Sequence, residues 1–342
     1  MAEPRVFVTR RIPGEGLSRL RERCRVDLWD DDLPPPVEAL RERVRGVAGL
    51  LCLLTDPVDE ALLDAAGPGL RVVSQMAVGV DNVDLAACTR RGVPVGHTPG
   101  VLTETTADLA VALLLAAARR LPEAQEAVRR GQWVTWKPLW LAGRDVHGAT
   151  VGIVGLGRIG RAVARRLAGF GCRILYAGPR PVPEAAGVGA RFVGLEELLA
   201  ESDFVTLHCP LMPETRNLIN ERTLALMKPT AILVNMSRGA VVDQAALHRA
   251  LAEGRIAGAA LDVTDPEPLP PGHPLLGLPN CLVVPHIGSA SVATRTRMAV
   301  VAAENLLAGL RGDRLAHCAN PEVYAGRDDG AKGSPGPRGE TI

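Results

Sequence analysis

The chain has 342 residues, a hydrophobic fraction of 47% and a formal net charge of +1. This length is enough for two domains of ordinary size, each with its own core. The balanced charge excludes the basic surface expected of a protein that binds nucleic acid or an anionic membrane.

The first hundred residues alternate short apolar runs with amphipathic stretches. Stretches such as EGLSRLRERC repeat their apolar residues at helical spacing. The apolar runs have the length of buried strands and cover residues 5–9, 26–29, 49–54, 70–76 and 93–96. This alternation predicts a parallel sheet with helices on both faces.

A long helical region begins at residue 103 and is followed by a second helical stretch and a tryptophan-rich loop, residues 131–140. A second α/β series starts at residue 150. Its expected strands are 151–154, 173–176, 204–208, 232–235, 259–263 and 281–285, and its expected helices are 159–170, 195–200 and 243–254. Residues 291–310 have the pattern of a closing amphipathic helix, which we expect to return to the first series.

The sequence thus predicts an α/β protein with two doubly wound parallel-sheet domains. We expect a discontinuous, flavodoxin-like domain of residues 1–102 and 290–320. Residues 103–289 are expected to form a Rossmann-type domain that carries an arm at about 121–148. Residues 321–342 are polar and rich in glycine and proline, so we expect them to be a disordered tail.

The seven cysteines are scattered and never form a CxxC pair. Their spacing predicts neither a disulfide framework nor a zinc site, and we expect no metal and only buried thiols in a reducing compartment. The N-terminus lacks the pattern of a signal peptide, and the apolar run 109–118 is too short to span a bilayer. We therefore expect a cytoplasmic protein without a membrane partner.

Residues 150–160 read TVGIVGLGRIG and place a G-x-G-x-x-G pattern between an apolar strand and a helix. We expect Gly155 to permit a tight turn, Gly157 to let a pyrophosphate approach the backbone, and Gly160 to allow close packing of helix on strand. Together with the helix N-terminus this predicts dinucleotide binding, the alternative being a purely structural turn. The intervening residues Leu156, Arg158 and Ile159 are expected to contact the cofactor too.

The second strand of this series leads into Gly178, Pro179 and Arg180, and no carboxylate appears before Glu184. NAD-specific proteins usually carry a carboxylate here for the ribose hydroxyls, whereas a nearby arginine suits the 2′-phosphate of NADP. We therefore expect NADP(H) to be preferred and NAD(H) to be possible. The alternative is that Arg180 is only a solvated loop residue.

Three residues that follow predicted strands could assist the reduction of a keto carbon by hydride transfer from a dinucleotide. Such a reaction needs a cation to polarise the carbonyl, an acid to protonate the oxygen, and a group that supports the acid. Arg238 of NMSRG, His286 of PHIGSA and Glu267 of LDVTDPEP have these chemistries. Each alone is as easily a surface cation, a structural histidine or a solvated carboxylate. Their joint occurrence after a dinucleotide motif predicts a catalytic set.

The segments GLGRIG, HCPLMPETR, NMSRGAVVD, LDVTDPEP and PHIGSA, in this order, resemble the D-isomer-specific 2-hydroxyacid dehydrogenase family up to about residue 321. The resemblance implies that Arg238 polarises the substrate, Glu267 supports the acid and His286 donates the proton. It also implies that the main-chain N–H groups of Val78 and Gly79, in AVGVDN, bind the substrate carboxylate.

The same resemblance implies further contacts in the site. Asp262 would lie near the nicotinamide carboxamide and Pro210 beside the adenosine. Met236 and Gly288 are also expected to contact the cofactor, and Ser289 to contact the substrate.

Segments such as RRIPGEGL, GLLCLLTD, WKPLWL and NLLAGLRG resemble the branch of this family that reduces glyoxylate to glycolate and hydroxypyruvate to D-glycerate. This implies an active site in the cleft between a substrate-binding first domain and a dinucleotide-binding second domain. It also implies a homodimer in which the arm carries Trp140 to the neighbouring subunit. The branch usually has Arg-Gln-Pro-Arg where this chain has residues 179–182, PRPV, which weakens the expected NADP preference.

Two alternatives remain open from the sequence. An enzyme similar to 3-phosphoglycerate dehydrogenase would need additional cations for the phosphate. A dinucleotide-sensing binding protein, like the corepressors that share this fold, would act through partner-binding clefts. The complete set of Arg238, Glu267 and His286 favours the small keto-acid reductase.

Overall fold

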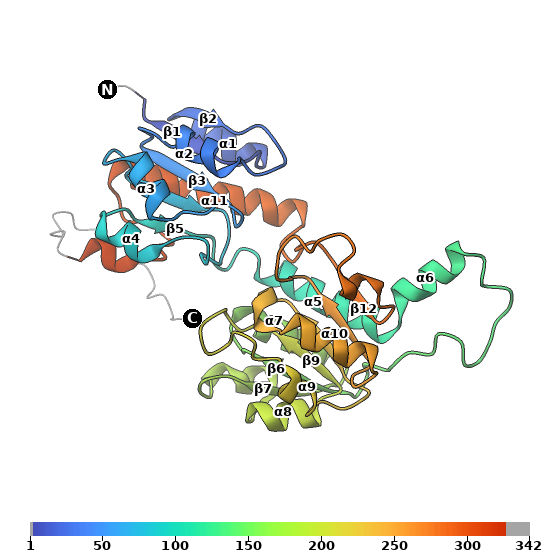
Figure 1. Ribbon diagram of the computed structural model, residues 1–342. Helices are drawn as coiled ribbons and strands as arrows, with labels where there is room; N and C mark the ends of the chain where they lie inside the picture. The colour runs from blue at the N-terminus through green and yellow to red at the C-terminus, as the bar shows by residue number, and fades with distance from the viewer. Residues whose placement is uncertain (1–2, 326–342) are drawn as a thin grey trace. The chain divides into compact units, whose positions relative to one another are not determined.

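The computed structural model describes residues 3–325, and the chain divides into two compact units (Figure 1). Unit 1 contains the residues up to Leu102 and those from Ala290, and unit 2 is Thr103–Ser289. Each unit is built on one sheet in which every strand pairing is parallel. The predicted fold class is therefore confirmed.

Unit 1 has a five-stranded sheet in the order β2-β1-β3-β4-β5, which is the order of flavodoxin-like sheets. Its strands are β1 (Arg5–Val8), β2 (Arg25–Leu28), β3 (Gly49–Cys52), β4 (Val72–Gln75) and β5 (Val95–Gly96). Alternate strand residues point to opposite faces, so Val6 and Val8 pack on one side and Phe7 on the other.

Each face of this sheet is covered by its own set of helices. On the side of Val6 lie α1 (Gly14–Arg21) and the long α11 (Val292–Arg311). On the side of Phe7 lie α2 (Val37–Arg43), α3 (Glu60–Ala66) and α4 (Leu85–Arg90). The closing helix thus belongs to the core of unit 1, although about 190 residues separate it from the rest of that unit.

Unit 2 has a seven-stranded sheet in the order β12-β11-β10-β9-β6-β7-β8. Its strands are β6 (Thr150–Val154), β7 (Arg173–Ala177), β8 (Ala190–Phe192), β9 (Phe204–Leu207), β10 (Ile232–Asn235), β11 (Gly258–Leu261) and β12 (Cys281–Val283). The strand order reverses between β6 and β9, and in sheets of this kind ligands bind outside the carboxyl ends of the strands at that point.

Helices again cover both faces of this sheet. One face packs on α5 (Thr103–Ala118) and α7 (Arg158–Ala168), and the other on α8 (Leu195–Glu201), α9 (Glu221–Leu224) and α10 (Gln244–Ala252). The helix α6 (Leu121–Arg129) and the loop after it extend away from the sheet (Figure 1).

Two sequence-based expectations need correction. The edge strand β8 was not predicted, because its three residues are largely exposed and form no apolar run. The disordered tail was expected to begin at residue 321, but Pro321–Tyr324 form a 3-10 helix, η4. Val323 and Tyr324 are buried there, and the Tyr324 hydroxyl accepts a hydrogen bond from the N–H of Leu315 at 3.0 Å. Residues 326–342 lie outside the described residues.

Within the described part of the chain, no helix combines the length and the apolar character needed to cross a membrane.

Candidate active site

The glycine loop after β6 shows the backbone geometry that the motif predicts. Gly155 has a φ of +92°, and a Cβ there would lie 2.7 Å from the backbone nitrogen of Cys209. A Cβ on Gly160 would lie 2.3 Å from the carbonyl oxygen of Gly155, so helix α7 can approach only because this residue is glycine. Gly157 faces open space, since among residues 3–325, its chain neighbours aside, no heavy atom lies within 4 Å of the position that its Cβ would take.

Helix α7 begins at Arg158 without a side-chain cap from Gly157 and without an acidic residue in its first turn. Its first N–H groups and its positive dipole end therefore remain suited to an anion such as a pyrophosphate. Around this turn Leu156 is buried, Ile159 is half-buried and Arg158 is exposed. The loop thus has the residues and the free space to hold a dinucleotide.

Strand β7 ends at Ala177, and residues 178–181 are exposed. Glu184, the first carboxylate after the strand, forms an ion pair with Arg161 at 3.3 Å. Arg180 is one of these exposed residues, and within residues 3–325 its side chain has no hydrogen bond or ion pair. It is therefore available for a ligand phosphate.

The end of β9 adjoins the glycine loop, since the N–H of His208 donates to the Val154 carbonyl at 2.8 Å. Burial lowers the pKa of His208 to about 3, so its imidazole is neutral at neutral pH. Its Nε2 lies 2.9 Å from the Thr206 hydroxyl. Two residues further, Pro210 is exposed, while Met236 at the end of β10 is buried.

Glu267 and His286 form a direct pair, in which Nδ1 of the imidazole donates to the carboxylate. This contact leaves Nε2 of the ring for another partner. Burial acts to raise the pKa of Glu267, but the hydrogen bond and charge of His286 outweigh it, with further help from the Thr264 N–H and from Arg238. The pKa of Glu267 therefore lies below its usual value, and the carboxylate is ionised.

Asp262 fixes the loop that carries His286. This side chain is only 3% exposed, and its two carboxylate oxygens accept the N–H groups of Ile287 at 2.7 Å and Gly288 at 2.9 Å. The N–H of His286 donates to the backbone carbonyl of Asp262 at 3.0 Å. These bonds hold His286 at a φ of +50°, an unusual backbone conformation for a residue other than glycine. Burial raises the pKa of Asp262, against the opposing effect of the two amides and of His286.

A buried asparagine, which the sequence reasoning did not single out, shapes the turn that carries Arg238. Asn235 accepts hydrogen bonds from the N–H of Ser237 at 3.0 Å and from its hydroxyl at 2.9 Å. It also donates to the carbonyl of Arg238 at 2.9 Å. The half-buried Arg238 donates to the Ser237 carbonyl at 2.8 Å. A buried asparagine at a strand end was the available signal for this role.

Gly239 brings the Arg238 turn against the loop that leads to Glu267. A Cβ on Gly239 would lie 1.9 Å from the carbonyl carbon of Thr264, so the two backbones are in contact. Gln244 reinforces this contact, since it accepts from the N–H of Asp265 at 3.1 Å and donates to the carbonyl of the same residue. The sequence reasoning missed both residues, and glycine directly after the arginine was the only signal.

The structure brings together the predicted residues of unit 2 that follow β10, β11 and β12. Arg238, Glu267 and His286 lie there, and the half-buried Ser289 closes the unit. Val78 and Gly79 belong to unit 1 and follow β4. Trp140 lies in the arm after α6, where the Lys137 ammonium is 5.2 Å from the centroid of its ring.

Comparison with known proteins gives a consistent result. The model of the D-isomer specific 2-hydroxyacid dehydrogenase NAD binding domain matches residues 111–288. A human protein named glyoxylate reductase/hydroxypyruvate reductase is 55% identical over 316 residues, which cover 91% of this chain and 96% of that protein. A Korarchaeum cryptofilum protein named glyoxylate reductase is 54% identical over 330 residues, which cover 96% and 99%.

Among solved structures, an NADPH-dependent glyoxylate/hydroxypyruvate reductase from Sinorhizobium meliloti, in complex with NADP and malonate, is similar to this chain. The two are 36% identical, with a TM-score of 0.84 and coverage of 94% of this chain and 98% of that one.

The close approach at Gly239 predicts that even a methyl group will disturb the site. We expect Gly239→Ala to lower the free energy of unfolding by about 3 kcal/mol, because the Thr264 backbone has to move. Urea unfolding measures this loss. Gly277→Ala is the matched control, since a Cβ there meets no atom of the described residues within 4 Å apart from its chain neighbours. It should change the stability by about 0.5 kcal/mol or less. Equal stabilities of the two variants would contradict the close approach.

The lowered pKa of Glu267 predicts a pH-dependent contribution to stability. An acid whose pKa is lower in the folded protein stabilises it above the unfolded pKa, here 4.5, and loses this effect as pH falls through the folded pKa. The stability difference between the native protein and Glu267→Gln should therefore be constant at neutral pH and shrink below about pH 4. Urea unfolding at several pH values tests this, with Glu253→Gln, from an exposed ion pair, as the control. A difference that stays constant down to pH 3 would refute the assignment.

Proposed function

The chain belongs to the D-isomer specific 2-hydroxyacid dehydrogenase family, as its motifs predicted, and we propose that it reduces glyoxylate to glycolate and hydroxypyruvate to D-glycerate. The observation that carries this proposal is the pairing of Glu267 with His286 beside the Arg238 turn. The names of the human and Korarchaeum relatives support the choice of substrates.

The proposed mechanism uses the groups of unit 2 in separate roles. Glu267 holds Nδ1 of His286, so that Nε2 can donate a proton to the keto oxygen. Arg238 supplies a planar cation that binds the substrate and polarises its carbonyl. A nicotinamide dinucleotide held at the glycine loop of Gly155, Gly157 and Gly160 would supply the hydride for C2. The electron pair of the carbonyl π bond moves onto the oxygen, which takes the proton from Nε2 of His286 and becomes the hydroxyl of the alcohol. His286 regains its proton from solvent.

We propose that the cofactor pyrophosphate lies over the turn formed by Gly155, Gly157 and Gly160. The open space at Gly157 and the uncapped start of α7 support this position. The remaining predicted cofactor contacts are Pro210, Met236, Asp262 and Gly288. The cofactor is proposed to be NADP(H) in preference to NAD(H), on the basis of the exposed Arg180 and the absence of a carboxylate at the end of β7.

The substrate carboxylate is proposed to bind the main-chain N–H groups of Val78 and Gly79, with Ser289 as a further contact. Within residues 3–325 the two N–H groups have no hydrogen-bond partner. Successive backbone N–H groups in a turn can form an anion-binding nest, which supports this position for the carboxylate. The cytoplasmic location expected from the sequence also remains part of this proposal.

We further propose that the protein is a homodimer joined through the arm at about residues 121–148. Trp136 is 80% exposed and Leu139 is 87% exposed, and Trp133 and Val134 nearby are also exposed. Apolar surface concentrated in this way is typical of a protein–protein contact. In such a dimer Trp140 would reach the active site of the neighbouring subunit.

The reaction is tested by following the loss of NADPH absorbance after addition of glyoxylate, hydroxypyruvate, pyruvate or 3-phosphohydroxypyruvate. We expect rapid oxidation with the first two, and about a thousandfold lower kcat in His286→Ala, because the proton donor is lost. NADPH binding to that variant should be unchanged. The same assay with NADH measures the cofactor preference. Dinucleotide binding without reduction of any keto acid would instead support the dinucleotide-sensing alternative.

The dimer is tested by light scattering. We expect Trp136→Asp to shift the protein towards the monomer, because the contact would have to bury a charge. Leu33→Asp, at another exposed leucine in unit 1, should leave the mass unchanged. A native protein that is monomeric at micromolar concentration would reject the dimer.

A further inference from the structure

Three consecutive carbonyl groups after β4 each have a partner within unit 1. The carbonyl of Ala77 accepts from the N–H of Thr98 at 2.8 Å, and that of Gly79 from the side-chain amide of Gln75 at 3.3 Å. Between them, the carbonyl of Val78 lies 3.0 Å from Nδ1 of His97. Since a carbonyl oxygen can only accept, His97 must carry its hydrogen on Nδ1 in this contact.

These bonds determine where the amides of the turn point. In a planar trans peptide the C=O and N–H groups point in opposite directions. The carbonyls of Ala77 and Val78 share their peptide planes with the N–H groups of Val78 and Gly79. Holding the carbonyls towards Thr98 and His97 therefore turns both N–H groups away from these partners, and the pair is ready for an anion.

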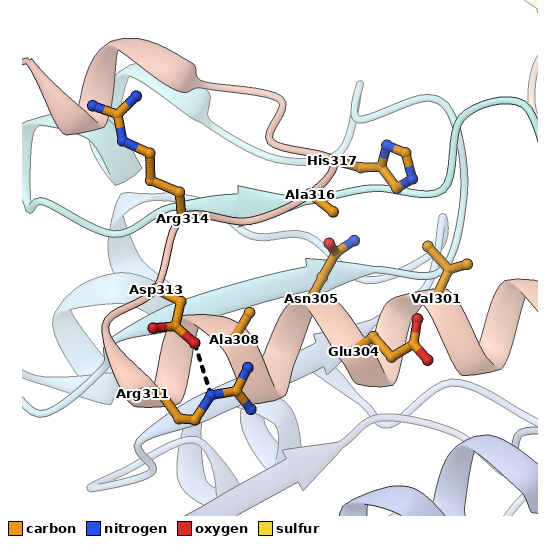
Figure 2. A pocket seen from close by; sticks show the side chains of 9 residues that line it. All are labelled: Val301, Glu304, Asn305, Ala308, Arg311, Asp313, Arg314, Ala316 and His317. Carbon is orange, nitrogen blue, oxygen red and sulfur yellow. Dashed lines mark hydrogen bonds and ion pairs between the residues drawn. The ribbon is translucent and has the colours of Figure 1, made fainter. Parts of the chain in front are cut away.

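The structure also restricts His97 itself. Its N–H donates to the carbonyl of His317 at 3.1 Å, and its carbonyl accepts from the side-chain amide of Asn305 at 2.9 Å. Asn305 can come this close only because Gly96 has no side chain, since a Cβ there would lie 2.7 Å from the Cβ of Asn305. Figure 2 shows Asn305 extending from α11 towards the segment of Ala316 and His317, at the edge of a cavity of about 290 Å³.

Gln75 is restricted in the same way. Its side chain is fully buried and donates to the Asn82 side chain at 2.6 Å. Asn82 in turn donates to the carbonyls of Leu53 at 3.0 Å and Asp56 at 2.7 Å. The carbonyl of Gly79 is therefore held by a buried network, and that of Val78 by His97. Since His97 is only half-buried, it can be substituted with less disturbance of the core than Gln75.

We propose that His97 is a positioning residue for the substrate carboxylate. By holding the Val78 carbonyl it aims the N–H of Gly79 at a carboxylate of the keto acid, without touching the substrate itself. This inference rests on the proposed function for the identity of the anion. It assigns His97 a role in substrate affinity and none in proton transfer.

The test compares His97→Leu, which removes the donor, with His97→Asn, whose side-chain amide can place a donor near the position of Nδ1. We expect His97→Leu to raise the KM for glyoxylate and hydroxypyruvate about fivefold, the effect of one hydrogen bond, with little change in kcat or in NADPH affinity. His97→Asn should restore the native KM. His147→Leu is the matched control, because Nδ1 of His147 makes the same kind of bond to the Phe170 carbonyl at 3.1 Å.

A native KM in His97→Leu, or an equally raised KM in His97→Asn, would overturn the proposal. If His97→Leu does not fold, His97→Asp takes its place in the comparison, because it puts a hydrogen-bond acceptor in place of a donor next to the Val78 carbonyl.

Amide hydrogen exchange separates this inference from the proposed function. The N–H of Thr98, bonded to the Ala77 carbonyl, should exchange faster in His97→Leu than in the native protein, whatever the enzyme reduces. Unchanged exchange would overturn the positioning role. Faster exchange in a protein that reduces no keto acid would support that role and reject the proposed reaction.

Discussion

The geometry of the candidate site in unit 2 depends on the contact between the backbone of Gly239 and that of Thr264. Two loops that follow neighbouring strands, β10 and β11, touch at this point without an intervening side chain. The contact places the Arg238 turn near the Glu267 carboxylate, and the effect of Arg238 on the pKa of Glu267 reflects this proximity. A close-packed interior transmits small displacements, so neither loop can move without the other.

A second level of support comes from buried carboxylate and amide groups that serve the backbone. Asp262 uses both of its oxygens on the loop of His286, and Asn235 uses both ends of its side chain on the turn of Arg238. Such buried polar groups are stable only when fully hydrogen-bonded, which fixes each loop in one conformation. The reacting side chains can therefore remain partly exposed while their backbones are rigid, as in His286, whose side chain is 28% exposed.

Much of the fold could be predicted from the sequence, because buried parallel strands form continuous apolar runs. The strand β8 could not, since an exposed edge strand has no such run, and the packing of Tyr324 was hidden by the polar residues that follow it. The three candidate catalytic residues were found because each follows a strand within a recognisable motif. The supporting roles of Gly239 and His97 depend on contacts between segments far apart in the sequence, which periodicity and composition do not reveal.

The discontinuity of unit 1 has a consequence for how the chain is made. One face of the first sheet, which includes Val6 and Val8, packs against α1 and α11, and α11 is synthesised only after the whole of unit 2. Until it emerges from the ribosome, that apolar face is covered only in part, while the whole of unit 2 is already available to fold. During synthesis unit 2 should therefore be complete first, and the nascent N-terminal sheet should be the part of the chain that most needs protection from aggregation.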